Sequence, residues 1–232
     1  MSTNKETFNR WELKYLVHVK TMYQIMEAIK NYVKPDENGT DGMYKISSLY
    51  YDTQDFKFYH EKADGQKFRQ KLRLRKYAAD RENSFFEIKQ RYNSTVMKKR
   101  VMLPDSDAYA LAEGALALEQ FNLEQRGVIE QIEYLLSVYA LVPKLNVCYM
   151  RRAFACIYEG DLRVTFDTNL KCSRHKDEQN QKYMICPYYA VMEIKADQRV
   201  PMWLIRVIQK YNLEANRVSK YCLGVETLFD NY

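Results

Sequence analysis

The chain is poor in several residue types that mark familiar classes of protein. It has 232 residues but only 7 glycines and 5 prolines, so long disordered stretches are not expected. Its 5 cysteines are an odd number, and no two of them have the C-x-x-C spacing. This pattern predicts reduced thiols and argues against both a disulfide framework and a zinc site. The 3 histidines, His18, His60 and His175, lie in unrelated segments, and we assign none of them a catalytic role.

Long apolar runs are also missing. The longest apolar-rich stretch, LLSVYALV at 135–142, is far shorter than the roughly 20 residues that a transmembrane helix needs. The first residues, MSTNKETFNR, contain no apolar segment of the kind found in secretory signals. We therefore expect a cytoplasmic protein, with a separate membrane protein as a candidate partner that would bring it to a membrane.

Apolar and charged side chains are both plentiful. Apolar residues make up 47% of the chain, enough for a sizeable core, and no linker divides it, so we expect one domain over residues 1–232. Charged residues make up 28%, and the net charge is +6. A mildly basic balance makes an anionic partner plausible without requiring one.

The segment FRQKLRLRKY, residues 68–77, concentrates positive charge. Its apolar and basic residues alternate, which predicts a β-strand with one apolar face and one cationic face. The cations that share a face are Arg69, Lys71, Arg73 and Arg75. Because like charges crowded on one strand face repel each other, this arrangement suggests that an anion neutralises them.

Similar charged faces recur along the chain. They carry Glu12 and Lys14, Glu87 with Lys89 and Arg91, Lys98 and Arg100, Arg163 and Asp167, and Glu193 and Lys195. For any one strand taken alone, an ordinary amphipathic strand with a solvated outer face is the favoured interpretation. Two features favour an interior site: cations outnumber carboxylates, and Glu-x-Lys recurs at 12–14, 87–89 and 193–195. Arginine and lysine would bind phosphate, and the carboxylates would hold a divalent metal ion.

The order of the predicted elements indicates an antiparallel α+β fold. About eight strand segments follow one another mostly as hairpins, and helices are expected near 20–34, 105–140 and 200–212. Asp105 is the expected N-cap of the second helical region. The interpretation is an eight-stranded antiparallel β-barrel tunnel, closed or nearly closed, with a polar, basic interior and flanking helices.

The chain resembles a known family, the VTC domain of polyphosphate polymerases, within the triphosphate tunnel metalloenzymes and CYTH proteins. The stretches that carry the resemblance are RWELKYLV, SSLYYDTQDFKFYHEKADGQKFRQKLRLRKY, FFEIKQR, VMKKRVML, YMRRAFACIYEGDLRVTFDTNL, YAVMEIK and VPMWLIRVIQKYNLEANRVSKYCLGVE. Together they span almost the whole chain. The resemblance implies an antiparallel eight-stranded tunnel that binds a triphosphate and a growing polyphosphate chain.

The resemblance also implies roles for individual residues. The residues expected to act on the reacting phosphates are Arg73, Arg75, Lys89, Lys98 and Arg163. Those expected to bind substrate are Lys14, Arg151, Arg217 and Lys220. Glu193 is the expected ligand of Mn²⁺ or Mg²⁺, with Glu87 and Glu12 as further candidates.

The implied reaction transfers the γ-phosphate of ATP to polyphosphate. Two alternatives keep the same tunnel: a catalytically silent subunit that binds polyphosphate or nucleotide, and a triphosphatase in which water is the acceptor. A nucleic-acid-binding surface is a fourth hypothesis, suggested by positive charge and 20 tyrosines, but no nucleic-acid motif supports it and no nucleic-acid partner is expected.

Overall fold

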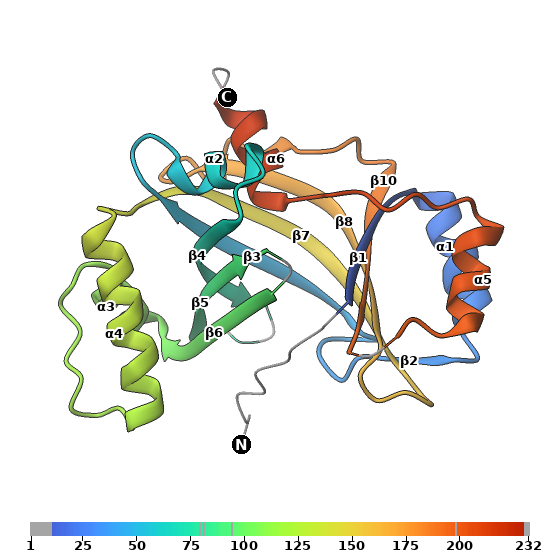
Figure 1. The fold of residues 1–232 in the computed structure, drawn as a ribbon, viewed down its shortest axis with the longest axis horizontal. Coiled ribbons are helices and arrows are strands. Elements are labelled where there is room, and N and C mark those ends of the chain that lie inside the picture. The colour runs from blue at the N-terminus through green and yellow to red at the C-terminus, as the bar shows by residue number, and fades with distance from the viewer. Residues whose placement is uncertain (1–10, 79, 81, 94, 198, 230–232) are drawn as a thin grey trace.

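The computed structural model describes residues 11–229 apart from residues 79, 81, 94 and 198, and it shows an α+β fold built on one antiparallel sheet (Figure 1). The strands are β1 (Trp11–His18), β2 (Val33–Pro35), β3 (Met43–Asp52), β4 (Phe68–Tyr77), β5 (Asn83–Tyr92), β6 (Thr95–Pro104), β7 (Val142–Cys156), β8 (Arg163–Arg174), β9 (Lys182–Tyr183) and β10 (Tyr189–Ala196). The helices are α1 (Val19–Ile29), α2 (Lys57–Ala63), α3 (Asp105–Ala112), α4 (Leu123–Val138), α5 (Met202–Lys210) and α6 (Lys220–Leu228).

The sheet is strongly curved. Its main path runs β1-β10-β8-β7-β3-β4-β5-β6, while β2 pairs with β7 and β9 with β8. Strands β1 and β5 are therefore far apart along this path, yet the Lys89 Nζ on β5 lies 3.0 Å from the Glu12 Oε2 on β1. Such a contact requires the sheet to curl around the face that carries these two side chains, and the curvature of the sheet is visible in Figure 1.

Three apolar cores fasten the helices to the sheet. Helices α1 and α5 cover the outer face of β1, β10 and β8, and α3 and α4 cover the outer face of β4, β5 and β6 (Figure 1). The third core lies on the inner face, where α6 packs against β3, β7 and β8. Ile25, Ile129 and Val225 are fully buried in the three cores. Each such side chain stabilises the fold by about 1.5–3 kcal/mol relative to leaving it exposed.

The prediction of an eight-stranded barrel, closed or nearly closed, is wrong in two respects. The sheet has 10 strands, and in the described residues the two strands that end its main path, β1 and β6, do not pair with each other. The chain before α6 partly covers the edge of β1, where the Asn216 amide donates to the Lys14 carbonyl at 2.7 Å. This irregular segment satisfies the Lys14 carbonyl and bridges to Tyr15 at Ala215, and so takes part of the place of a neighbouring strand.

Two local predictions also need correction. The helix expected over 20–34 ends at Ile29, because Val33 pairs with Cys156 of β7 and Pro35 disfavours a helix before it. Asp105 is the first residue of α3 and not its N-cap, which is Pro104. The Asp105 carboxylate instead contacts Lys76 and accepts a hydrogen bond from Ser84 Oγ at 2.7 Å.

No helix in the described part of the chain combines the length and the apolar character that crossing a membrane demands.

Gly42 offers a test of the turn into β3. Its φ is +69°, and a Cβ there would lie 2.5 Å from the Ala153 carbonyl oxygen. We expect Gly42→Ala to lower the free energy of unfolding by at least about 1–2 kcal/mol in urea denaturation. Gly127→Ala is the matched control, because a Cβ at this α4 position meets no atom within 4 Å. It should raise stability by about 0.5–1 kcal/mol, and equal effects of the two changes would refute the argument.

Candidate functional site

The inner face of the curved sheet gathers charged side chains from most of its strands. The strand alternation that the sequence predicts is present, since Leu72, Phe86 and Ile194 are fully buried in the outer cores. The polar side chains between them point inward. We call this surface the inner charged face. It is formed by Glu12, Lys14, Lys71, Arg73, Arg75, Glu87, Lys89, Lys98, Arg151, Asp167, Glu193, Lys195 and, from α6, Lys220.

Glu87 on β5 holds three cations of the inner charged face. Its Oε2 lies 2.5 Å from the Arg73 Nη2 and 3.8 Å from the Arg75 Nη1, and its Oε1 lies 2.5 Å from the Lys98 Nζ. The residue is 1% exposed. Burial alone would raise the pKa of Glu87, but Arg73, Arg75 and Lys98 hold it well below its usual range. Both oxygens face cations, so the geometry suits a fixed counter-ion better than a metal ligand.

Asp167 on β8 plays the same part for two further cations, Arg151 and Lys220. The Arg151 Nε and Nη2 donate to its two oxygens at 2.7 and 2.8 Å, and the Lys220 Nζ lies 2.7 Å away. Asp167 is fully buried. Burial favours a raised pKa, yet Lys220 and Arg151 lower the pKa of Asp167. The salt bridges of this carboxylate therefore connect β8 to β7 and α6, and they orient Arg151 and Lys220 toward the inner charged face.

Glu12 and Glu193 form a third carboxylate group, on β1 and β10. Glu12 contacts Lys14 at 2.7 Å and Lys89 at 3.0 Å, and Glu193 contacts Lys195 at 2.8 Å through Oε1. Burial opposes ionisation of Glu12, but Lys89 and Lys14 lower its pKa to about 2. The pKa of Glu193 is held well below its usual range, against burial, chiefly by Lys195 and Lys14. Both groups are carboxylates at neutral pH.

The carboxylates fit a metal ion whose remaining ligands are phosphate oxygens and water. In the described residues no group of three or more His, Cys, Asp or Glu side chains gathers around one point. Glu12 and Glu193 are diagonal neighbours across β1 and β10, since Lys14 pairs with Glu193. Mg²⁺ is commonly bound by one or two carboxylates together with substrate phosphates and water. Glu193 is the better candidate, because among the described residues its one salt bridge is made through Oε1, to Lys195.

Two inner-face residues outside the predicted set, Tyr50 and Lys71, have pKa values lowered to about 8. Lys71 on β4 donates from Nζ to the Ser219 Oγ at 2.7 Å, and burial lowers its pKa to about 8. The Tyr50 hydroxyl on β3 accepts from the Arg73 Nη1 at 3.1 Å. Burial would raise the Tyr50 pKa, but Arg73, Arg75 and Lys71 lower it to about 8. Alternation alone placed Lys71 on the charged face, whereas nothing in the sequence distinguished Tyr50 from a core tyrosine.

Two of the predicted site residues lie at the margin of this surface or outside it. Arg163 begins β8, forms an ion pair with Asp36 and is the cross-strand partner of Lys195, so it joins the rim of the inner charged face. Arg217 is exposed, in the segment between α5 and α6. The other predicted residues meet on the inner charged face: Lys14, Arg73, Arg75, Lys89, Lys98, Arg151, Lys220, Glu12, Glu87 and Glu193.

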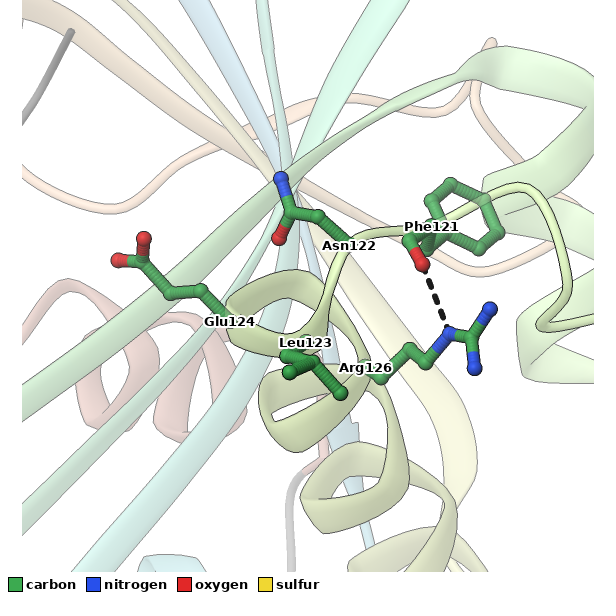
Figure 2. Close-up of a pocket in the computed structure, with 5 residues that line it drawn as sticks. All are labelled: Phe121, Asn122, Leu123, Glu124 and Arg126. Carbon is green, nitrogen blue, oxygen red and sulfur yellow. Dashed lines mark hydrogen bonds between the residues drawn. The ribbon is translucent and has the colours of Figure 1, made fainter.

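A hollow elsewhere on the surface lacks comparable chemistry. It lies at the start of α4 and is lined by Phe121, Asn122, Leu123, Glu124 and Arg126 (Figure 2). The Arg126 Nε donates to the Phe121 carbonyl at 2.7 Å, which ties the helix to the preceding turn. Arg126 therefore serves the local fold, and we place the functional site on the inner charged face.

Removing the charge of Asp167 should destabilise the fold. Asp167→Asn leaves the largely buried Arg151 and Lys220 without a counter-ion, so we expect a loss on the order of 3 kcal/mol in urea denaturation. Added tripolyphosphate should restore part of this loss by supplying the missing negative charge. Asp161→Asn, at an exposed position, is the control and should change little. A loss as small as that of the control would show that the carboxylate is not needed.

Anion affinity should fall as pH rises through about 8. Below this pH Lys71 is cationic and Tyr50 neutral, whereas above it Lys71 is neutral and Tyr50 is a phenolate. Both changes weaken attraction for an anion. Calorimetry with tripolyphosphate at pH 7 and pH 9 should show weaker binding at the higher pH. The double variant Tyr50→Phe, Lys71→Met should show a flatter pH profile, and an unchanged profile would contradict these assignments.

Comparisons with known proteins agree with the resemblance in the sequence. The chain is 24% identical over 98% of its length to vacuolar transporter chaperone complex subunit 4 of Trypanosoma brucei brucei, of which it covers 35%. It is 22% identical over 97% of its length to the same subunit of Schizosaccharomyces pombe, of which it covers 38%. The chain thus spans little more than a third of these relatives.

A solved structure shares the fold. A protein of Bacillus halodurans, to which adenylate cyclase activity has been ascribed, superposes with a TM-score of 0.55 over 91% of this chain and 96% of its own, at 13% identity. At that identity the likeness concerns the fold alone. A family model described as the VTC domain matches residues 9–229, which is nearly the whole chain. The protein therefore belongs to the VTC domain family.

Proposed function

We propose that this domain is a metal-dependent polyphosphate polymerase that uses ATP as its phosphate donor. The observation that carries the proposal is the convergence of Arg73, Arg75, Lys98, Arg151 and Lys220 on one curved face, held there by two buried carboxylates. Guanidinium groups bind phosphate oxygens through paired donors, and lysines add point charges. Cations in excess over carboxylates suit a ligand that carries several negative charges in a row.

The proposed step requires no covalent intermediate with the protein. A terminal phosphate oxygen of the polyphosphate chain attacks the γ-phosphorus of ATP, and the bond from that phosphorus to the oxygen bridging it to the β-phosphate breaks. ADP leaves with the bonding electrons, and the chain gains one phosphate. The attacking oxygen is ionised at neutral pH, so no general base is required. Positioning and charge neutralisation by Arg73, Arg75 and Lys98 are then the main contributions.

Glu193, with Glu12 beside it, would hold the metal ion. The ion, Mn²⁺ or Mg²⁺, would neutralise charge on the phosphate oxygens that it contacts. Glu193 suits this role because its pKa is held well below its usual range, so the carboxylate stays ionised. Lys195 contacts it from its own strand, and Lys14 is its cross-strand partner on β1.

The names of the relatives suggest protein partners for this domain. They are named as subunits of a complex, so we propose that this domain also works with other proteins, among them a separate membrane protein. Its own position would then be cytoplasmic, at a membrane surface through that partner.

The test is incubation of the purified protein with ATP and Mn²⁺, with separate measurement of polyphosphate and free phosphate. We expect polyphosphate, and we expect Glu193→Gln to lower its rate of formation about a hundredfold or more while the fold is kept. Glu130→Gln, at an exposed position on α4, is the matched control and should retain wild-type activity.

The other products would identify the alternatives. Free phosphate without polyphosphate would make the protein a triphosphatase with water as the acceptor. No product, together with tight binding of tripolyphosphate, would leave a polyphosphate- or nucleotide-binding subunit. Wild-type activity of Glu193→Gln at saturating Mn²⁺ would overturn the metal assignment.

A further inference from the structure

A fully buried carboxyl group at the end of β3, that of Asp52, belongs to none of the three carboxylate groups of the inner charged face. Its Oδ1 accepts hydrogen bonds from the amides of Thr53 at 2.7 Å and Phe58 at 2.8 Å, and its Oδ2 accepts one from the amide of Tyr59 at 3.0 Å. Phe56, the N-cap residue of α2, has no polar side chain with which to cap the helix. Asp52 therefore satisfies the first amides of α2 from the end of β3.

A fourth donor reaches Asp52 from α6. The Tyr221 hydroxyl, 169 positions further along the chain, donates to the Asp52 Oδ2, and Tyr221 is 2% exposed. Burial, and then the neighbouring Asp52, raise the pKa of Tyr221, so the hydroxyl keeps its proton and remains a donor. One buried carboxyl group thus fixes α6 to β3 and α2.

The two residues that precede Tyr221 contact the inner charged face. The Ser219 Oγ accepts a hydrogen bond from the Lys71 Nζ at 2.7 Å, and the Lys220 Nζ lies 2.7 Å from the Asp167 Oδ2. Both residues lie at the start of α6, directly after an irregular segment. The position of this helix start therefore depends on the tertiary contacts of α6, among them the hydrogen bond of Tyr221.

The ring of Tyr221 also contacts the inner charged face. It stacks on Tyr50 with the ring centroids 5.1 Å apart, and the Tyr50 hydroxyl accepts from the Arg73 Nη1 at 3.1 Å. The Lys71 Nζ is 5.7 Å from the centroid of the Tyr221 ring, within the range of a cation–π contact. A shift of α6 would therefore change the surroundings of cations on β4 as well as those on the helix.

We propose that Tyr221 is a positioning residue, whose hydrogen bond to Asp52 fixes α6 so that Lys220 reaches the phosphates bound on the inner charged face. This inference rests on the proposed function, because it takes Lys220 to bind phosphate there. The salt bridge to Asp167 holds only the end of the flexible Lys220 side chain, whereas the Tyr221 hydroxyl fixes the backbone that carries it. Binding and phosphoryl transfer both depend on groups held close to their productive geometry.

The experiment removes a single oxygen atom. Tyr221→Phe keeps the ring that stacks on Tyr50 but lacks the donor to Asp52. In calorimetry at pH 7, the variant should bind tripolyphosphate about tenfold more weakly than the wild type. Its rate of polyphosphate formation from ATP should fall by about tenfold or more.

A matched control removes a tyrosine hydroxyl away from the site. The Tyr211 hydroxyl, at the end of α5, donates to the Gln24 carbonyl of α1 at 3.3 Å, on the outer side of the sheet. Tyr211→Phe should change neither affinity nor rate. Binding is measured well below the melting temperatures of all variants, where a hydrogen bond that served stability alone would leave the affinity unchanged.

A double-mutant cycle identifies the residue through which Tyr221 acts. If the hydroxyl acts by placing Lys220, Tyr221→Phe should weaken binding less than twofold once Lys220→Met is present, whereas independent effects would multiply. Lys220→Met leaves Asp167 paired with Arg151 through two hydrogen bonds. If Tyr221→Phe fails to fold, Asp52→Asn takes its place in the cycle, because asparagine keeps one oxygen acceptor for the α2 amides.

Three results would overturn the inference: unchanged affinity in Tyr221→Phe, an equal loss in Tyr211→Phe, or losses that multiply in the double variant with Lys220→Met. Failure of the proposed function is a separate outcome. If the protein makes no polyphosphate but the losses in tripolyphosphate affinity are coupled, Tyr221 still positions Lys220 for an anion. If the wild type and Tyr221→Phe make polyphosphate at equal rates and bind tripolyphosphate equally, only the inference on Tyr221 fails.

Discussion

The structure depends on the neutralisation of crowded cations by a few buried carboxylates. Glu87 and Asp167 are almost completely buried and between them face five basic side chains: Arg73, Arg75, Lys98, Arg151 and Lys220. Without these carboxylates the inner charged face would repel itself, and the buried cations would have no partner. With them, positive charge still exceeds negative charge, so the face remains ready for an anion. Glu87 and Asp167 therefore stabilise the cluster of cations but do not neutralise all of its positive charge.

The division between apolar and charged strand faces explains how one sheet serves both stability and the site. The outer face buries residues such as Ile88 and Ile194 under helices on two sides, and this burial supplies the driving force for folding. The inner face contributes the third apolar core, where α6 packs against β3, β7 and β8 near Val147, and it carries charged side chains elsewhere. Curvature of the sheet then brings β1 opposite β5, which turns separate rows of charge into a single site.

Much of the fold was predictable because strand alternation is a local property. The period of two along 68–77 separates Leu72 from Arg73 without any knowledge of neighbours, and the structure confirms the strand. The closed barrel was not predictable, because closure depends on whether β1 and β6 meet, and no local pattern reports that distance. The end of α1 was missed for a similar reason, since Val33 leaves the helical pattern to pair with β7.

For the site, the sequence by itself determined which side chains share a face of each strand, and hence that cations and carboxylates would be presented together. It also carried the family resemblance, which the family model supports over residues 9–229. Only the tertiary structure decided the partners: Asp167 with Lys220, Glu12 with Lys89, and Arg69 with Arg91. The physical reason is that side-chain direction follows from local backbone geometry, whereas ion pairs between distant residues depend on sheet order, register and curvature.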